Sequence, residues 1–269
     1  MRTYSYTPLH WPSLVPLCLL FLLLSAFATL LEAKLPILDG QKTTKKIDEI
    51  LAGHANQKKI TPELMKRIYV NFIEELDPNK SYFIRSDIER WLNPTDEQLQ
   101  QSIQEYKEGN FSTFFEIRDE MVQAIEKRKK FEKKLDYEQL PKKVNPKEFK
   151  DLDWVDNDEQ LFDRLEKIRA LQTDAAKKLD DDVKEKALQR LQKYRSKNEE
   201  EIANTNKDHE RNFVLSKVLK ATATSLDSHT AYFTPDEATQ FLINVEQRLF
   251  GIGAQLRDDI NGFTNFNNT

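Results

Sequence analysis

Leu226–Gly253 reads LDSHTAYFTPDEATQFLINVEQRLFGIG, and this stretch decides how the rest of the chain is interpreted. Its first two residues end an apolar-periodic helix, and the next three predict a turn. A helix is then expected from Thr234, an N-cap residue, because Pro235 follows at the first helical position and Glu237 completes a capping box. One face of this helix is apolar at helical spacing and consists of Ala238, Phe241, Leu242, Val245 and Leu249.

An earlier stretch has the same order of parts. Leu76–Phe83 reads LDPNKSYF, and Leu226–Phe233 reads LDSHTAYF, so Leu-Asp precedes Tyr-Phe by the same spacing in both. Each copy follows an amphipathic helix and precedes a capped one, with Ser86 and Glu89 as the expected cap in the first copy. We interpret the two as a duplicated or structurally equivalent helix–turn–helix element. Two copies are too few for a solenoid.

The two LD…YF units and the Gly-Ile-Gly-Ala sequence at 251–254 together resemble the tail-specific (C-terminal processing) proteases, the S41 family of serine peptidases. The resemblance covers residues 36–257, with Ser228 where the family usually has proline, and Trp154 also resembles a family position. The structural motif consists of Leu76, Asp77, Tyr82, Phe83, Leu226, Asp227, Tyr232 and Phe233.

The resemblance implies a peptide-binding loop near the end of the chain. Gly251, Ile252 and Gly253 would be the loop of a PDZ domain that receives a peptide's terminal carboxylate, and Ala254–Leu256 would begin the strand that pairs with the peptide. In the family, a serine activated by a lysine lies in a domain that would follow residue 269. The family's partners are unfolded proteins or peptide C-termini. Gly251, Ile252 and Gly253 suit an ordinary turn equally well. Only about 13 residues follow Leu256, so the strand would have no sheet to join and would be unstable.

The expected fold is mainly α: a multi-helix N-terminal domain with a truncated start of a PDZ domain at the C-terminus. The expected domains are a signal peptide at 1–33, a helical domain at 34–249, and an incomplete PDZ start with an irregular tail at 250–269. Asn261–Thr269 is rich in asparagine and aperiodic, which suggests a truncated or frame-shifted reading frame.

The first 33 residues have the pattern of a secretory signal peptide. Arg2 and His10 precede an apolar run, Ala26-Phe27-Ala28 offers an A-x-A cleavage site, and Leu31-Glu32-Ala33 offers a second one. An uncleaved membrane anchor is the alternative, because Leu14–Leu31 reaches the lower limit of a spanning helix. The only cysteine, Cys18, lies in this segment, so a cleaved chain has neither a disulfide nor a thiolate metal site. The pattern predicts a periplasmic protein.

Composition predicts a helical protein with a charged surface. Hydrophobic residues make up 39% and charged residues 32% of the chain, with a net charge of −4 and six glycines. No basic patch interleaved with aromatic residues is evident, so nucleic acid is not an expected partner. The basic run Lys127–Lys130 is interpreted as a solvated helix face, because glutamates flank it.

Helical periodicity continues between the two LD…YF units. Residues 34–43 read as an extended lead, and 135–156 as a crossing loop that contains Pro141 and Pro146. The polar segment 180–204 suggests a projecting helical arm. Helices are expected from Thr43 or Thr44, from Thr61, from Thr95, and over 111–134, 158–172, 180–204 and 210–226.

The chain offers no recognisable catalytic chemistry, so no catalytic residue is assigned. Ser228 and His229 are adjacent and expected to face different ways, and Asp227 is expected to hydrogen-bond to the local backbone. His54 and His209 lack partners at ligand spacing and are expected at a helix end and a surface tip. Neither a metal nor a cofactor is predicted.

The leading hypothesis is the scaffold and substrate-gating N-terminal domain of a periplasmic tail-specific serine protease, which would be inactive alone. The alternative is a stand-alone helical protein-interaction module in the cell envelope, with a protein partner. A membrane-anchored coiled coil is disfavoured because no strict heptad pattern persists. Contact with the membrane is expected only through the signal or anchor segment.

Overall fold

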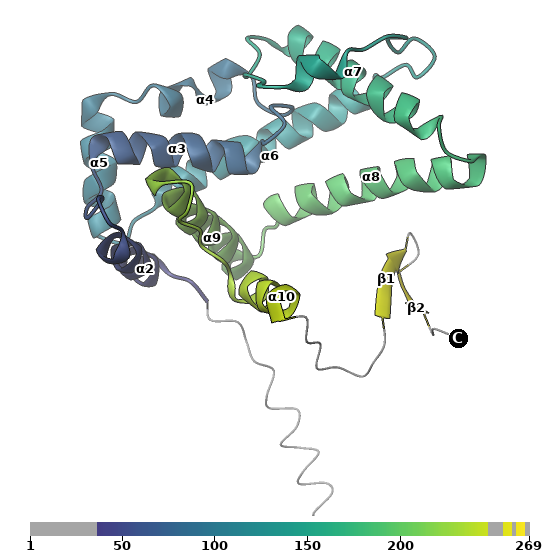
Figure 1. The fold of residues 1–269 in the computed structure, drawn as a ribbon. Helices are drawn as coiled ribbons and strands as arrows, with labels where there is room; N and C mark the ends of the chain where they lie inside the picture. The colour runs from purple at the N-terminus through teal and green to yellow at the C-terminus, as the bar shows by residue number, and fades with distance from the viewer. Residues whose placement is uncertain (1–36, 247–254, 260–261, 267–269) are drawn as a thin grey trace, which may run out of the picture. The chain divides into compact units, whose positions relative to one another are not determined.

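The structure is a computed structural model that describes residues 37–246, 255–259 and 262–266. Nine α-helices lie in the first of these ranges (Figure 1). They are α2 (Gly40–Gly53), α3 (Pro62–Leu76), α4 (Arg85–Leu92), α5 (Asp96–Lys107), α6 (Ser112–Glu132), α7 (Asp158–Ala176), α8 (Asp181–Ile202), α9 (Lys207–Leu226) and α10 (Pro235–Glu246), with a short 3-10 helix, η1 (Pro146–Phe149), before α7.

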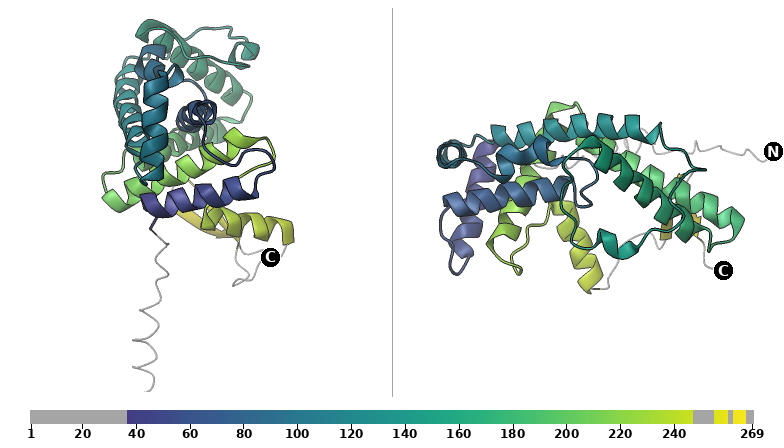
Figure 2. Two further views of the ribbon diagram at one scale, coloured as in Figure 1. Left: turned by 90° about the vertical axis from the view of Figure 1, so that its left-hand side faces the viewer. Right: turned by 90° about the horizontal axis from the view of Figure 1, so that it is seen from above.

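Helix α3 is the centre of the hydrophobic core. It packs on α9, α5, α4 and α6, and Figure 2 (left) shows it nearly end-on with other helices around it. Its apolar residues recur on more than one side, so it can be buried against several neighbours. Phe114 of α6 lies with its ring 5.4 Å from that of Tyr69 and 5.0 Å from that of Phe72. The helix before the first LD…YF turn is therefore fixed on most sides.

Local capping signals predict three helix starts correctly. Thr61 accepts a hydrogen bond from the Leu64 N–H ahead of α3, at 3.2 Å. Thr95 and Gln98 form the capping box of α5. Glu237 accepts from the Thr234 N–H at 2.9 Å, and Thr234 Oγ1 accepts from the Glu237 N–H at 3.3 Å. In each case the signal lies within four residues, so it does not depend on the rest of the fold.

Two helix starts differ from the sequence prediction. Helix α2 begins at Gly40 rather than Thr43, because the Asp39 side chain accepts from the Lys42 N–H at 2.8 Å and caps it earlier. Helix α4 begins at Arg85, so Ser86 and Glu89 are not its cap. Asp87 accepts from the Ile84 N–H instead, at 3.1 Å. A long-range bond from the Arg85 N–H to the Val155 carbonyl, 2.7 Å, fixes this start.

Helices α7 and α8 form an antiparallel pair beyond α6, and the polar segment 180–204 forms the predicted helix (Figure 1). Among its described side chains, α8 buries only Glu199 and Ile202. Leu191 is 49% and Tyr194 78% exposed. An amphipathic helix is normally held by its apolar face. Polar contacts must therefore contribute much of what holds α8 in place.

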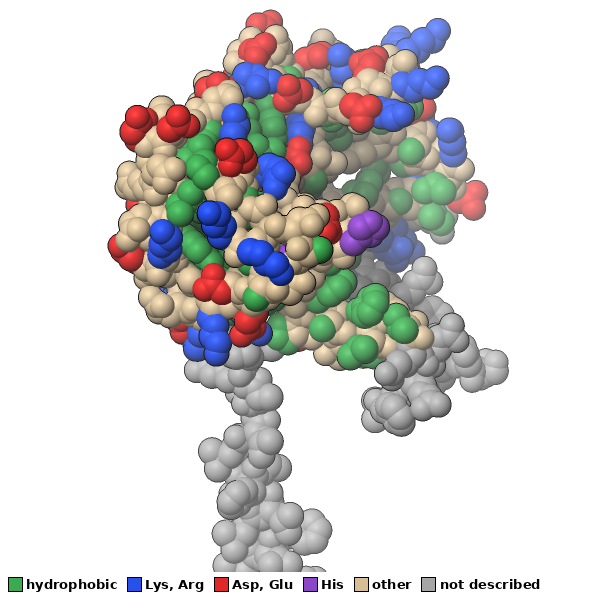
Figure 3. All heavy atoms as spheres, turned by 60° about the vertical axis from the view of Figure 1, so that its left-hand side comes forward, with side chains coloured by type: hydrophobic (Ala, Val, Ile, Leu, Met, Phe, Trp, Pro, Cys, Tyr) green, Lys and Arg blue, Asp and Glu red, His purple; other side chains and the backbone are tan. Residues whose placement is uncertain are grey.

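Helices α9 and α10 follow the two predicted periodic segments but differ in burial. Phe213, Val214, Val218 and Leu219 of α9 are buried, while Leu226 is partly buried against the core. On α10, Phe241, Leu242 and Val245 are 50%, 53% and 62% exposed. Figure 3 shows hydrophobic side chains gathered at this part of the surface.

Two short strands are described after α10. β1 (Gln255–Asp259) pairs antiparallel with β2 (Gly262–Phe266), with Gln255 opposite Phe266. Part of the tail predicted to be irregular is therefore a strand. A two-stranded hairpin does not by itself establish a PDZ sheet, so the PDZ start at the C-terminus stays a prediction. The predicted loop Gly251–Gly253 lies outside the described residues.

The predicted signal peptide also lies outside the described residues. Within the described part of the chain, none of the helices has the length and apolar character needed to cross a bilayer.

Candidate functional site

Asp77, the acid of the first LD…YF unit, organises the turn after α3. Its carboxylate is buried and accepts from the backbone N–H of Ser81 (2.8 Å), Tyr82 (3.2 Å) and Phe83 (3.2 Å). The Trp154 Nε1–H is a fourth donor, at 3.3 Å. Burial raises the pKa of Asp77, and these donors act against the rise. The acid therefore serves as the internal acceptor that closes the turn.

Lys80 lies inside this turn with φ +49°, a left-handed conformation that costs about 1–3 kcal/mol for a non-glycine residue. Its surroundings fix it there. Its ammonium contacts Glu74 at 2.7 Å and lies 4.2 Å from the centre of the Trp154 ring. The Arg164 guanidinium donates to the Lys80 carbonyl at 2.5 Å. The turn thus holds Lys80 nearly buried between two helices.

Arg128 of α6 joins the same turn from the other side. Its Nη1 donates to the Ser81 carbonyl (3.0 Å) and to Ser81 Oγ (2.7 Å). Its guanidinium carbon lies 4.6 Å from the centre of the Tyr82 ring. Arg128 is buried, so the prediction that Lys127–Lys130 is a solvated face is wrong at this residue. Lys127 pairs with Asp87 (3.1 Å) and Asp158 (3.0 Å), whereas Lys129 is exposed.

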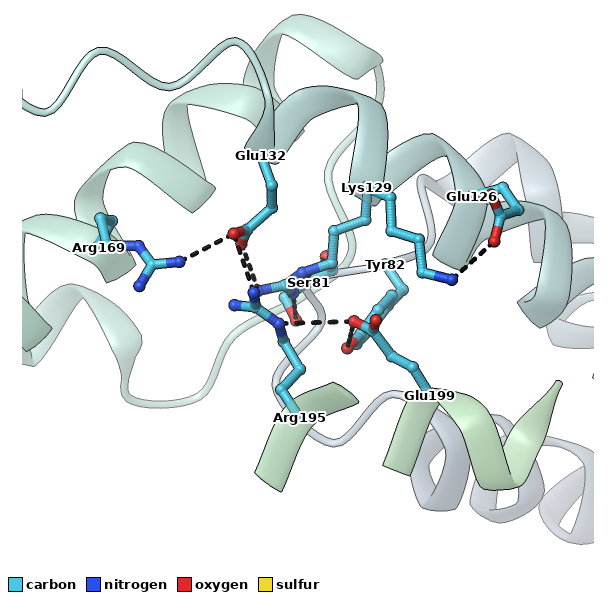
Figure 4. Close-up of polar contacts among 9 residues, drawn as sticks. Ser81, Tyr82, Glu126, Lys129, Glu132, Arg169, Arg195 and Glu199 are labelled. Atoms are coloured by element: carbon cyan, nitrogen blue, oxygen red, sulfur yellow. Dashed lines mark hydrogen bonds and ion pairs between the residues drawn. The ribbon is translucent and has the colours of Figure 1, made fainter. Parts of the chain in front are cut away.

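Glu132 connects α6 to α7 and α8 through arginines, and Glu199 connects α8 to the first LD…YF turn through Tyr82 (Figure 4). Glu132 accepts from Arg169 at 2.8 Å and from Arg195 at 2.9 Å, and it lies 3.5 Å from Arg128. Glu199 accepts from the Tyr82 hydroxyl at 2.8 Å and lies 3.6 Å from Arg195. Burial, with the nearby Glu199 carboxylate, raises the pKa of Tyr82, so this phenol is a donor at neutral pH.

A cleft of about 1530 Å³ opens beside this cluster. Its walls come from the end of α3 and the turn after it, Arg128 of α6, residues 149–152, α7 and α8. The lining includes seven basic side chains, Lys80, Arg128, Arg169, Arg190, Lys193, Arg195 and Lys197, and four acidic ones, Glu74, Asp77, Asp151 and Glu201. Apolar side chains lie among them, so the cleft can contact apolar and charged groups at once.

The second LD…YF turn has a related but more exposed arrangement. Asp227 accepts from the backbone N–H of His229 and Thr230, both at 2.8 Å, as the sequence predicted. His54 Nε2 lies 2.8 Å from its other oxygen. The hydrogen bond from His54, with those from the turn, holds the pKa of Asp227 well below its ordinary value. Tyr82 and Phe83 are buried, but Tyr232 is half-buried and Phe233 is exposed.

The adjacent Ser228, His229 and Asp227 do not form a catalytic triad. The histidine ring that contacts Asp227 is that of His54, at the C-terminal end of α2. Nδ1 of His54 already accepts from the Gln57 N–H at 2.9 Å, so neither ring nitrogen is left to deprotonate a serine. His209 lies in the first turn of α9. Among the described residues, His, Cys, Asp and Glu side chains form no cluster suited to a metal ion.

The sequence identified the two turns but missed the cleft. Glu132, Arg169 and Arg195 carry no local signal, because their periodicity is that of any charged helix. They come together only when α6, α7 and α8 pack. The one indication was the basic run at 127–130, in which position 128 falls on the buried face of α6.

Comparison with known protein families gives one result that covers most of the chain. A family model described as the tail specific protease N-terminal domain matches residues 46–236. Comparison with curated proteins gives no match. The matched residues include both LD…YF turns and every element that lines the cleft.

Proposed function

The chain belongs to the family of tail-specific protease N-terminal domains, and from this membership we propose that it is the non-catalytic scaffold of such a protease. In this role it holds the PDZ domain of the enzyme and controls how unfolded protein reaches the serine-protease site. The PDZ domain and the serine-protease site enter this proposal from the resemblance of residues 36–257 to tail-specific proteases.

The exposed apolar face of α10 is the observation that carries this proposal. Phe233 stacks on Phe241 at 5.3 Å, and both rings are about half exposed, as are Leu242 and Val245. Contiguous apolar surface of this kind marks an interaction site. The family match ends at residue 236, and the resemblance to a PDZ domain begins near residue 250. Helix α10 therefore lies where a scaffold would receive the next domain.

The polar groups of the described residues support a binding role rather than a catalytic one. Acyl transfer needs a nucleophile with an adjacent base. The buried serines of the described residues have no such base: Ser81 bonds to Arg128, Ser102 to Tyr69, and Ser225 to Asn71. Ser112 is exposed and lies 3.4 Å from the Glu105 carboxylate, which is longer than the roughly 2.6–3.2 Å between a nucleophile and its base. We propose that the 269-residue chain does not cut peptide bonds by itself.

We further propose that the chain works in the periplasm, after residues 1–33 direct its export. An uncleaved first segment would anchor it to the inner membrane instead. Mass spectrometry of the protein from a periplasmic extract distinguishes these outcomes, because cleavage removes the first 33 residues. A full-length mass in the membrane fraction would contradict cleavage.

A stand-alone interaction module is the second candidate, because the same α10 face could bind a separate envelope protein. The two candidates differ in what α10 recognises. A partner captured at fixed stoichiometry that contains no PDZ domain would favour the module.

The test is a calorimetric titration of the purified chain with a separately produced PDZ domain from a tail-specific protease of the same organism. We expect binding, and we expect the double variant F241S/L242S to weaken it by at least about tenfold, since central apolar residues dominate interfaces. The control is L179S/V183S, which removes two similarly exposed apolar side chains elsewhere. No binding by the wild-type chain, or equal losses in both variants, would overturn the scaffold role.

A further inference from the structure

We propose that the cleft beside Asp77 binds an extended polypeptide segment in which acidic residues lie next to large apolar ones. The inference deepens the proposed gating role and rests on it, but it concerns a surface other than α10. Three properties of the cleft carry it: its dimensions, the two stripes on α8, and the exposure of its apolar residues.

The dimensions suit a peptide. The cleft volume of about 1530 Å³ exceeds the roughly 300–1,000 Å³ that is usual for small-molecule sites. Its wall on α8 runs from Ala187 to Glu201, about 21 Å at roughly 1.5 Å rise per residue. An extended strand rises about 3.3 Å per residue, so about six residues would span this wall.

Two stripes run side by side on the cleft-facing part of α8. Ala187, Leu191 and Tyr194 recur at helical spacing and form an apolar stripe. Arg190, Lys193 and Lys197 recur at the same spacing and form a basic stripe. Because an extended peptide turns successive side chains to opposite sides, alternate residues can reach the two stripes. Apolar residues would lie on one and carboxylates on the other.

The apolar stripe is exposed although it lines a concavity. Leu191 is 49% and Tyr194 78% exposed, and Phe149, Ile168 and Leu171 line the same cleft. Apolar surface gains roughly 25 cal/mol for each Å² removed from water. A segment that carries large apolar side chains would cover this surface from both walls.

The charges of the cleft select the sign of the occupant. The chain as a whole is acidic, with a net charge of −4. Arg128, Arg169 and Arg195 in the lining are already paired with Glu132 or Glu199. The charge that the cleft presents to an occupant is therefore that of the exposed basic stripe on α8. Opposite charges attract, so this stripe favours carboxylates over basic groups on the occupant.

A polypeptide fits these features better than a nucleic acid. Glu74, Asp151 and Glu201 also line the cleft and would repel a phosphate backbone along its length. The lining has three aromatic residues, Tyr82, Phe149 and Tyr194, and Tyr82 is buried under Arg128, so few rings are open to the base stacking typical of single-strand binding. A peptide needs carboxylates only at alternate positions and tolerates acidic side chains elsewhere.

Fluorescence anisotropy with the full 269-residue chain tests the proposal. The probe is a labelled eight-residue peptide of alternating glutamate and leucine, compared with the same peptide carrying lysine in place of glutamate. We expect the glutamate peptide to bind at least about tenfold more tightly than the lysine peptide, and its affinity to fall with salt. Equal affinity for both peptides, or tighter binding of a labelled single-stranded oligonucleotide, would overturn the proposal.

Variants on α8 locate the binding. Tyr194→Ser and Lys197→Glu change exposed side chains, so neither is expected to unfold the chain, and each should weaken binding of the glutamate peptide about tenfold. Val183→Ser is the matched control, because Val183 is an exposed apolar residue of α8 outside the cleft. If Val183→Ser bound the glutamate peptide as weakly as Tyr194→Ser does, a binding site in the cleft would be contradicted.

The α10 variant separates this inference from the scaffold role. F241S/L242S should no longer bind the PDZ domain but should still bind the glutamate peptide. Tyr194→Ser should still bind the PDZ domain and bind the glutamate peptide weakly. PDZ binding without peptide binding overturns the cleft site alone. Peptide binding without PDZ binding overturns the scaffold role and supports the cleft site.

Discussion

The aspartate of the Leu-Asp pair contributes more to stability in the first LD…YF turn than in the second. Both acids follow a Leu at the end of a helix, yet Asp77 is buried with four N–H donors whereas Asp227 lies in solvent. Removing an acceptor from a buried set leaves its donors unsatisfied, which is costly, while water can replace an exposed acceptor.

We therefore predict that Asp77→Asn lowers the free energy of unfolding by roughly 2–4 kcal/mol, because the new amide NH₂ faces N–H donors. Urea unfolding followed by circular dichroism measures this loss. The matched control is Asp227→Asn, for which we expect a smaller shift in midpoint. Equal shifts in the two variants would mean that the hydrogen bonds to the buried Asp77 carboxylate do not stabilise the first turn.

Gly40 and Gly53, at the two ends of α2, provide a second matched pair. A Cβ at Gly40 would lie 1.7 Å from the Gly109 carbonyl oxygen, whereas a Cβ at Gly53 meets nothing within 4 Å. We predict that Gly40→Ala costs on the order of 2–4 kcal/mol through this backbone clash. Gly53→Ala should stabilise by about 0.5 kcal/mol, because alanine favours helix. Thermal midpoints of the two variants should move in opposite directions.

The lowered pKa of Asp227 predicts that the stability of the fold depends on pH. The hydrogen bond from His54 lowers its folded pKa, so its contribution to stability is present above the unfolded pKa of about 3.9 and is lost as pH falls through the lowered folded value. The urea midpoints of the wild-type chain and Asp227→Asn should differ at pH 6 and converge as the pH falls below about 4. If the difference between the two urea midpoints stayed constant with pH, ionisation of the Asp227 carboxylate would not be the cause of the stabilisation.

Sequence reasoning succeeded at single residues where the partner is close in the chain. The caps at Thr61, Thr95 and Thr234 need only the next three residues. It failed at Ser86, because the bond between Arg85 and Val155 spans a distant loop and sets the helix start instead.

At the scale of elements, α8 is held by polar contacts. Glu199 and Ile202 are the buried residues among its described side chains, and Tyr82 and Glu132 connect α8 to the remainder of the fold through Glu199 and Arg195. Elements with few buried apolar contacts open locally at low free energy. Periodicity predicted the helix and its exposed character, but not these contacts, because they join three segments.

We predict that Tyr82→Phe loosens α8 more than it destabilises the whole domain. The change removes the hydroxyl donor of buried Glu199, which costs about 1–3 kcal/mol locally. Limited trypsin digestion should cut within α8 several-fold faster in this variant. The control is Tyr137→Phe, whose side chain is 60% exposed and whose digestion should match the wild type. Unchanged digestion of Tyr82→Phe would contradict the role of this bond.

At the scale of the whole molecule, the two LD…YF turns have come to lie in opposite environments. Trp154, Arg128 and α8 cover the first turn, whereas the aromatic residues after the second remain exposed beside the apolar face of α10. The fold class and the order of helices follow from periodicity, which is a local property. The position of the cleft does not follow from periodicity, because α3 with its turn, α6, residues 149–152, α7 and α8 build it together.

The central proposal is that this member of the tail-specific protease N-terminal domain family is a helical scaffold that binds protein and does not cut peptide bonds by itself. The most direct test incubates the purified 269-residue chain with an unfolded protein and measures new α-amino groups over time. We predict no release above the level without the chain. Release that rises in proportion to chain concentration and stays with the chain through every purification step would contradict the claim.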